Sequence, residues 1–232
     1  MTNSVLTETA VIRLTRRWTC VLFDLDGTIM DSAPGITDRL AKTLVELGRP
    51  VPSEQELMRW VGPPILDSFR DFAGMDPEQA REALTVYRRF AQVDGPYDGS
   101  AVFPGVAGLI VRLHKAGIPI ALATSKPESQ AVMILDHFDL SQYFTVLCGA
   151  SEDESRSAKS DIVAETLLRL QGEGVDLSQV VLVGDRSYDV AGATAHDIPT
   201  IMVEWGYGSP AEAEGTMAVV HSADQLGRLL LG

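Results

Sequence analysis

The sequence predicts an α/β fold, with a parallel-sheet core and an inserted, all-helical domain. Apolar, strand-like runs recur along the chain, at residues 20–23, 118–123, 145–148, 180–183 and 200–203. Helical patterns separate most of these runs, and such alternation is the signature of a parallel sheet. With 232 residues, 45% of them hydrophobic, the chain is long enough for one substantial core and a smaller insert.

The first strand-like run ends in two carboxylates. Residues 21–23 are Val-Leu-Phe, which is typical of a buried strand, and Asp24 and Asp26 follow directly. Open α/β sheets bind ligands at the carboxyl ends of their strands, and residues two apart in an extended chain point to the same side. The two carboxylates repel each other unless a cation or a shared proton relieves them. Taken alone, the stretch is more simply explained as an acidic turn after a strand.

The interval between the first two strands is unusually long. Residues 33–102 contain no convincing strand, whereas a simple crossover needs only about ten to twenty residues. We therefore expect a helical cap domain at 33–102, lying over the strand ends of a core made of residues 1–32 and 103–232. Gly62 and Pro63 break the helical pattern within the cap. They are candidates for a loop that enters the site, and a plain turn between helices is the alternative.

Capping patterns predict where several helices begin. Pro34 suits a first helical turn, and residues 53–56 (Ser-Glu-Gln-Glu) match a capping box. Residues 76–77 (Asp-Pro) precede an apolar stripe at helical spacing. Residues 222–225 (Ser-Ala-Asp-Gln) again resemble a capping box, which predicts a terminal helix through Leu231.

Polar residues with a potential chemical role follow three later strands. Thr124 and Ser125 come directly after an apolar run, where the simpler interpretation is a cap for the helix that follows. Lys159 precedes another helical pattern and, taken alone, is expected to be exposed. Asp185 and Asp189 follow the fourth strand, where a turn and a helix cap are again the alternative. All of these positions fall at the carboxyl ends of parallel strands or in the loops after them.

Considered together, these residues point to phosphoryl chemistry. The carboxylates are hard oxygen ligands suited to Mg²⁺, which favours a phosphate as a further ligand; they are Asp24, Asp26, Asp185 and Asp189. Thr124 and Lys159 are the hydrogen-bond donors that a phosphoryl group needs for charge neutralisation.

The order of these groups resembles the four motifs of the haloacid dehalogenase superfamily. The first motif is Asp24-Leu25-Asp26-Gly27-Thr28, and it is followed by Thr124, Lys159 and Gly184-Asp185 with Asp189. The helical insert after the first motif is similar to the type-1 cap of the phosphoglycolate phosphatase-like branch. Several further segments resemble a 5′-nucleotidase-like subgroup of that branch, namely residues 62–64, 123–127, 155–159, 184–186 and 205–208.

The resemblance implies a Rossmann-like core and a role for each site residue. Asp24 is expected to be the nucleophile that forms an aspartyl-phosphate, and Asp26 the acid and base for the leaving oxygen and the attacking water. Because residue 26 is a second aspartate, phosphoryl transfer is expected instead of dehalogenation. The phosphoryl group is expected to contact Thr124, Ser125 and Lys159, with Gly62 and Pro63 approaching the substrate from the cap. Mg²⁺ is expected at Asp24, the backbone carbonyl of Asp26, and Asp185, with Asp189 just behind them.

Composition limits the possible partners and location. The net charge of −13, from 32 acidic and 19 basic residues, argues against a nucleic-acid polymer as partner. No stretch reaches membrane-spanning length, no leader is evident in residues 1–19, and Arg13, Arg16 and Arg17 are expected to form a solvated basic cluster. Cys20 and Cys148 are expected to be buried thiols in a reducing compartment. We expect a cytoplasmic monomer or homodimer whose partner is a small phosphorylated metabolite.

The leading hypothesis is an Mg²⁺-dependent phosphatase for phosphoglycolate or a nucleoside monophosphate. A phosphomutase would use the same aspartyl-phosphate, but the predicted cap shows no obvious Lys/His pair for a second phosphate. A protein-tyrosine phosphorylation role is a third possibility, although the sequence contains no Walker loop or kinase signature. A non-catalytic module that only binds metal and phosphate would not need Asp26, and a turnover assay distinguishes it from the enzymes.

Overall fold

A computed structural model describes residues 17–153 and 155–232, and its core is the predicted parallel α/β sheet. Six strands are arranged in the order β5-β4-β1-β6-β7-β8, with every neighbouring pair parallel. Their bounds are β1 Cys20–Phe23, β4 Ile120–Pro127, β5 Val146–Ala150, β6 Val180–Gly184, β7 Thr200–Val203 and β8 Ala218–Val220. The four strands that precede the predicted site residues, β5, β4, β1 and β6, are thus adjacent in the sheet.

Both faces of the sheet are covered by helices. Alternate residues of β1 enter two apolar clusters: Val21 and Phe23 pack on one side, Cys20 and Leu22 on the other. The first cluster includes side chains of α5 (Val106–Lys115), α6 (Glu128–His137) and α9 (Ala223–Leu231). The second includes side chains of α7 (Lys159–Gly172) and α8 (Ser187–Thr194). This burial on both sides explains why the strands are uniformly apolar.

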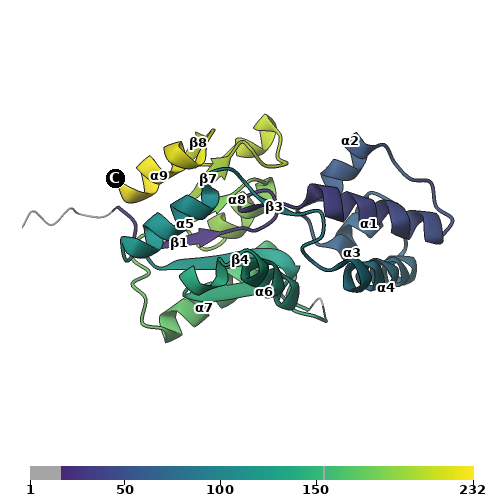
Figure 1. Ribbon diagram of the computed structural model, residues 1–232, viewed down its shortest axis with the longest axis horizontal. Coiled ribbons are helices and arrows are strands. Elements are labelled where there is room, and N and C mark those ends of the chain that lie inside the picture. Colours follow the sequence, from purple (N-terminus) through teal and green to yellow (C-terminus); the bar gives the residue numbers. More distant parts are fainter. Residues whose placement is uncertain (1–16, 154) are drawn as a thin grey trace, which may run out of the picture.

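The helices between β2 and β3 stand together at one end of the molecule (Figure 1). They are α1 (Ala33–Glu46), α2 (Glu54–Leu57), the 3₁₀ helix η1 (Met58–Trp60), α3 (Ile65–Asp71) and α4 (Pro77–Asp94). They share a separate apolar cluster in which Leu40, Phe69 and Tyr87 are buried. The capping box at Ser53 forms as expected, and the helix predicted to follow Asp76 begins with a capping box as well. We refer to this group, residues 33–94, as the helical cap.

Short elements escaped the sequence prediction. β2 (Met30–Asp31) pairs antiparallel with β3 (Ala101–Val102), so the chain enters and leaves the helical cap through a small two-stranded ribbon. The expectation that residues 33–102 lack a strand is therefore wrong at Ala101–Val102. β8, of three residues, was also missed. Elements of two or three residues are too short to show a periodicity, and only pairing with a distant strand defines them.

The terminal helix begins at the predicted place but with a different cap. The Ser222 hydroxyl accepts a hydrogen bond from the Gln225 N–H, as a capping box requires. The Gln225 side chain, however, accepts from the N–H of His221 and not from that of Ser222. The predicted capping box is therefore only half formed.

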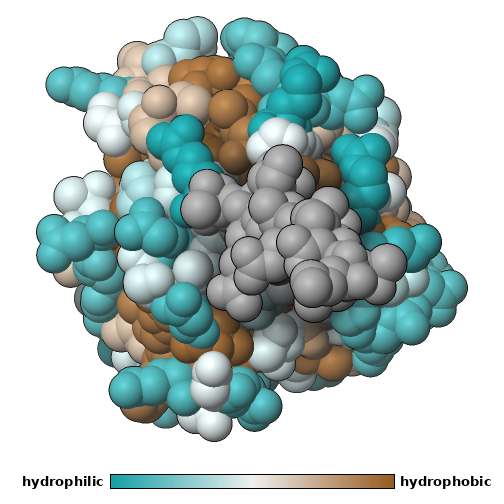
Figure 2. All heavy atoms as spheres, turned by 90° about the vertical axis from the view of Figure 1, so that its left-hand side faces the viewer, coloured by the Kyte–Doolittle hydropathy of each residue, from teal (hydrophilic) through white to brown (hydrophobic). Residues whose placement is uncertain are grey.

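The other compositional predictions have mixed outcomes. Cys20 and Cys148 are free and buried as expected, and burial raises the pKa of the Cys20 thiol to about 12. Of the predicted basic cluster, Arg13 and Arg16 lie outside the described residues. The expectation that residues 1–19 contain no leader also falls mostly on residues that are not described. On the face turned away from the helical cap, hydrophilic side chains surround smaller hydrophobic areas (Figure 2). Among the described helices, none is both long and apolar enough to cross a membrane.

Candidate active site

Two carboxylates meet where β1 and β6 end side by side. Phe23 and Val183 are register partners in these parallel strands, and the Asp24 N–H donates a hydrogen bond to the Val183 carbonyl. Asp24 and Asp185 thus leave the sheet at neighbouring points. Gly27, with φ +85°, lies in the loop that follows β1, and a Cβ atom there would lie 2.2 Å from Asp185 Oδ2. Only glycine permits both this backbone conformation and this close approach.

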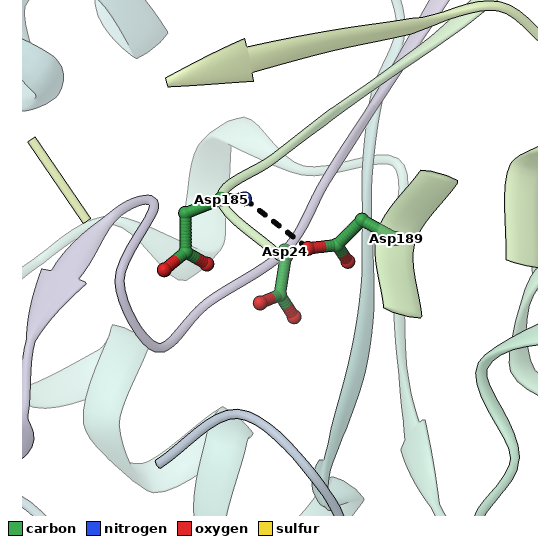
Figure 3. A group of neighbouring side chains, drawn as sticks. All are labelled: Asp24, Asp185 and Asp189. Carbon is green, nitrogen blue, oxygen red and sulfur yellow. Dashed lines mark hydrogen bonds between the residues drawn. The ribbon is translucent and has the colours of Figure 1, made fainter. Parts of the chain in front are cut away.

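Asp24, Asp185 and Asp189 form a buried group of carboxylates (Figure 3). One oxygen atom from each lies within 4.8 Å of the others. Burial, together with the negative charge of Asp189, raises the pKa of Asp24 to about 6, although Lys159 opposes the shift. Burial and the charges of Asp189 and Asp24 also hold the pKa of Asp185 well above its ordinary value. The group is therefore short of positive charge, and oxygen donors so arranged suit a divalent cation.

Lys159, the first residue of α7, is the cation of this group. Its Nζ atom lies 2.7 Å from Asp24 Oδ1 and 2.7 Å from Asp189 Oδ1, and it donates a hydrogen bond to the carbonyl of Ala123. Burial lowers the pKa of Lys159, but the charges of Asp189 and Asp24 outweigh it and raise that pKa overall. The exposed position that its residue type suggests is wrong, because three acceptors hold the ammonium inside.

Asp189 organises the loop after β6. Its Oδ2 atom accepts hydrogen bonds from the N–H groups of Asp185 (3.1 Å) and Arg186 (3.0 Å), and its Oδ1 atom faces Lys159. Both oxygens of Asp189 are therefore engaged. Asp185 instead receives a hydrogen bond on Oδ2 from the Tyr207 N–H and only a long one, 3.5 Å, on Oδ1 from Thr28. This leaves Asp185 freer than Asp189 to bind a metal directly.

The Asp26 side chain is not part of the carboxylate group and has partners of its own. Its carboxylate forms an ion pair with Lys126, with Nζ at 2.8 and 3.1 Å from the two oxygens, and accepts a 2.5 Å hydrogen bond from the Ser32 hydroxyl. Neither partner was singled out by the sequence reasoning. Lys126 lies in the segment 123–127 whose resemblance was noted, and that segment was the signal available for it.

Thr124 and Ser125 lie at the carboxyl end of β4, beside these residues. The strand continues to Pro127, which occupies the N-cap position of α6 without a side-chain capping bond among the described residues. The alternative interpretation of Thr124 and Ser125 as a helix cap is therefore wrong. Thr124 is buried, and its hydroxyl accepts a hydrogen bond from the Lys126 N–H.

A cavity that is partly open to solvent separates the sheet from the helical cap. On the sheet side it is lined by Asp26, Ser125, Lys126, Pro127 and Gln130, and on the cap side by Ile36, Gly62, Pro63, Ile65, Leu84, Tyr87 and Arg88. The loop with Gly62 and Pro63 thus lies beside Asp26. The same loop is tied to the strand ends, because Nη1 of Arg186 donates to the carbonyl of Val61, and Nε of Arg186 donates to Glu212.

Comparison with known proteins places this arrangement in a family. The sequence pattern of the haloacid dehalogenase-like hydrolases matches residues 21–203, which include every predicted site residue. The chain belongs to this family of hydrolases. A solved structure of a predicted phosphatase from Clostridium acetobutylicum superposes with a TM-score of 0.86 at 34% sequence identity, covering 92% of this chain and 98% of that one.

Relatives of the chain differ in the activity that their names state. Tyrosine-protein kinase PtkA of Mycobacterium tuberculosis is 41% identical over 205 residues, which are 88% of this chain and 68% of that protein. A 5′-nucleotidase of Pseudomonas aeruginosa is 33% identical over 208 residues, covering 90% and 92% of the two chains. A phosphoglycolate phosphatase of Pseudomonas savastanoi is 32% identical over 222 residues, covering 91% and 78%. The predicted resemblance to the phosphoglycolate phosphatase and 5′-nucleotidase branch is confirmed.

Proposed function

We propose that the protein is an Mg²⁺-dependent phosphatase that hydrolyses a small phosphomonoester through an aspartyl-phosphate intermediate. The observation that supports this best is that two aspartates of the same loop lie in different surroundings. Asp24 lies in the buried carboxylate group and is paired with Lys159, whereas Asp26 faces the cavity and lies outside that group. A nucleophile and a separate proton donor on the leaving-group side are the two parts that such a reaction needs.

In the proposed reaction, a carboxylate oxygen of Asp24 attacks phosphorus and the ester P–O bond breaks. Asp26 supplies the proton that the leaving oxygen takes up, and later removes a proton from the water that hydrolyses the acyl-phosphate. Lys159, held between Asp24 and Asp189, offsets the charge of the incoming phosphoryl group together with Thr124 and Ser125. Lys159 also keeps the Asp24 carboxylate oriented for attack.

The residues present fit Mg²⁺. Asp24 and Asp185 supply carboxylate oxygens, the backbone carbonyl of Asp26 is the expected third ligand, and Asp189 holds the loop and Lys159 behind them. When bound, the ion would polarise the phosphoryl oxygens and neutralise the crowded carboxylates. Hard oxygen donors without sulfur or imidazole favour Mg²⁺ over softer metals.

The names of two relatives suggest the substrate. We infer that the substrate is phosphoglycolate or a nucleoside monophosphate, since relatives bear the names phosphoglycolate phosphatase and 5′-nucleotidase. The cavity walls contributed by the helical cap, among them Gly62 and Pro63, would contact the leaving group. We also infer that the enzyme acts in the cytoplasm as a monomer or homodimer; the free, buried cysteines support a reducing compartment.

A tyrosine-phosphorylation activity is the second candidate, supported by the 41% identity to a relative named tyrosine-protein kinase. The two candidates differ in the acceptor of the phosphoryl group, which is water for the phosphatase and a tyrosine hydroxyl for the kinase. A panel of phosphoglycolate, nucleoside monophosphates and sugar phosphates, assayed with Mg²⁺, tests the phosphatase directly. Metal-dependent release of inorganic phosphate from one compound class is the expected result. No release from any ester, including p-nitrophenyl phosphate, together with phosphate transfer from ATP to a tyrosine substrate, would overturn the proposal in favour of the kinase.

A further inference from the structure

Tyr207 is held against the candidate metal site by its backbone. The segment 205–208, Trp-Gly-Tyr-Gly, follows β7, and the Tyr207 N–H donates a 2.7 Å hydrogen bond to Asp185 Oδ2. The flanking glycines permit this contact. A Cβ atom on Gly206 would lie 2.3 Å from the Cβ of Asp185, and one on Gly208 would lie 2.0 Å from the Asp185 carbonyl oxygen. The position of the tyrosine is therefore set by close packing on Asp185.

The Tyr207 hydroxyl lies at the start of α1, the first helix of the cap. It accepts hydrogen bonds from the N–H groups of Ser32 (2.7 Å) and Ala33 (2.9 Å) and donates one to Asp31 Oδ1 (3.0 Å). A phenolic hydroxyl has one donor and two acceptor positions, so all of its capacity is used. The two amides belong to the first turn of α1, whose N–H groups have no partner within the helix.

Ser32 stands at the N-cap of α1 but does not act as a cap. Serine is favoured at this position because its side-chain oxygen accepts a bond from the helix amides, yet Ser32 makes no such bond. Its hydroxyl instead donates to Asp26 Oδ1 at 2.5 Å. Tyr207 instead supplies the acceptor at this end of the helix, for the amides of Ser32 and Ala33, and the Ser32 hydroxyl is directed to Asp26.

We propose that Tyr207 is a positioning residue for proton transfer by Asp26 and acts through Ser32. The hydrogen bonds to Tyr207 set the backbone at residues 32–33. The Ser32 hydroxyl then fixes one oxygen of Asp26, whose side chain lines the cavity. Lys126 contacts the same carboxylate from the neighbouring strand. The inference rests on the proposed phosphatase function, because Asp26 is the proton donor only in that reaction.

The positioning role of Tyr207 can be measured through the dependence of kcat/KM on the leaving group. An ester whose leaving group is a poor one depends on protonation by a general acid, whereas a good leaving group departs with little help. Phenyl phosphate and p-nitrophenyl phosphate differ little in size, and phenol is the poorer leaving group. Tyr207→Phe and Ser32→Ala should each lower kcat/KM for phenyl phosphate about tenfold more than for p-nitrophenyl phosphate, a fraction of the roughly 10²–10⁴-fold that a general acid contributes.

A double-mutant cycle tests whether Tyr207 acts through Ser32. If it does, the Tyr207→Phe/Ser32→Ala variant should show the same leaving-group selectivity as Ser32→Ala alone. Tyr143→Phe, at a tyrosine that packs on His114 away from the site, is the matched control and should leave both rates unchanged. Thermal unfolding of each variant reports loss of fold separately, and Ser32→Ala keeps the test available if Tyr207→Phe is unstable.

The possible results separate this inference from the proposed function. Equal losses on both esters, or additive selectivity in the double variant, would show that Tyr207 is merely structural and would overturn the inference. In that case a wild-type enzyme that hydrolyses both esters still upholds the phosphatase. A wild-type enzyme without phosphatase turnover contradicts the proposed function and the inference together.

Discussion

Lys159 Nζ lies 2.7 Å from Asp24 Oδ1, although 135 positions separate the two residues in the chain. The same ammonium lies 2.7 Å from Asp189. When Asp24, Asp185 and Asp189 are all ionised, one lysine leaves two negative charges in the group, which is the charge that one divalent cation neutralises. The pairing thus joins the residues that are proposed as nucleophile, phosphate ligand and metal ligands, and each proposed role can be tested.

Asp24→Asn should abolish turnover while the protein stays folded. An amide cannot form the acyl-phosphate, and the loss of one carboxylate relieves repulsion in the buried group, so the metal-free variant should be at least as stable as the wild type. Phosphate release and thermal unfolding measure the two effects. Asp224→Asn, at an aspartate whose side chain is 80% exposed, is the control. Activity of Asp24→Asn within about tenfold of the wild type would contradict the mechanism.

Lys159→Gln should remove activity and also destabilise the fold. The substitution leaves the Asp24 and Asp189 carboxylates buried without their cation, and breaking a buried ion pair in this way costs about 3 kcal/mol. Chemical unfolding at neutral pH measures the loss. Lys115→Gln, at an exposed lysine at the end of α5, should change stability by less than about 0.5 kcal/mol. Equal stability of the two variants would rule out a structural role for the Lys159 ion pairs.

Metal dependence should follow the carboxylate group. EDTA should remove activity, and Mg²⁺ should restore it and raise the melting temperature of the metal-free protein. Ca²⁺ should bind but inhibit, because it accepts more ligands at longer distances and can take both oxygens of the nucleophile. In Asp185→Asn, the rise in melting temperature with Mg²⁺ should be lost, and this readout does not depend on catalysis. Full activity in EDTA would contradict the proposed cofactor.

The metal-free protein should lose stability as the pH rises. The pKa of Asp24 is raised by burial from 3.8 to about 6, and that of Asp185 is also raised. Groups with a raised pKa in the folded state contribute stability that is complete below their unfolded pKa and is lost as the pH rises through the folded value. For Asp24 this loss runs from about pH 4 to about pH 6, so the melting temperature should fall as the pH rises through that range, and less so in Asp185→Asn.

Added Mg²⁺ provides the complementary measurement. Protons compete with the ion for these carboxylates, so Mg²⁺ should stabilise the protein more at about pH 7.5 than at about pH 5. The same change in melting temperature for the metal-free wild type and Asp185→Asn across this range would show that Asp185 does not take up a proton there.

Gly62→Ala should change substrate preference without changing the metal requirement. Gly62 has φ +112°, and a Cβ atom there would lie 3.1 Å from Nη1 of Arg186, on the wall of the cavity beside Asp26. Gly74→Ala is a matched control, since Gly74 also has a positive φ, +63°, but its Cβ would meet open space. Both changes should cost roughly 1 kcal/mol of backbone strain.

Only Gly62→Ala should alter the ratio of kcat/KM between phosphoglycolate and a nucleoside monophosphate. An unchanged ratio in both variants would leave the loop as a plain turn between helices.

Local patterns in the sequence were sufficient for the central strands, and they pointed to the aspartates that the structure brings together at the ends of those strands. Residues 20–23 form a buried run that is followed by Asp24, and β1 begins and ends where this run does. The same patterns failed for β2, β3 and β8, which are too short to show periodicity. They also failed for the partners of Asp26, because nothing local indicates that Ser32 turns its hydroxyl away from its own helix.

By itself, the sequence determined the α/β class, the position of the helical insert and which residue types stand at the ends of the strands. These properties depend on hydrophobic periodicity and capping, which act over a few neighbouring residues. The tertiary structure alone decided that Lys159 meets Asp24 and that Tyr207 caps the helix beside Asp26. Contacts of this kind arise when the order of strands in the sheet and the docking of the helical cap bring distant segments within hydrogen-bonding distance, and no local pattern records that order.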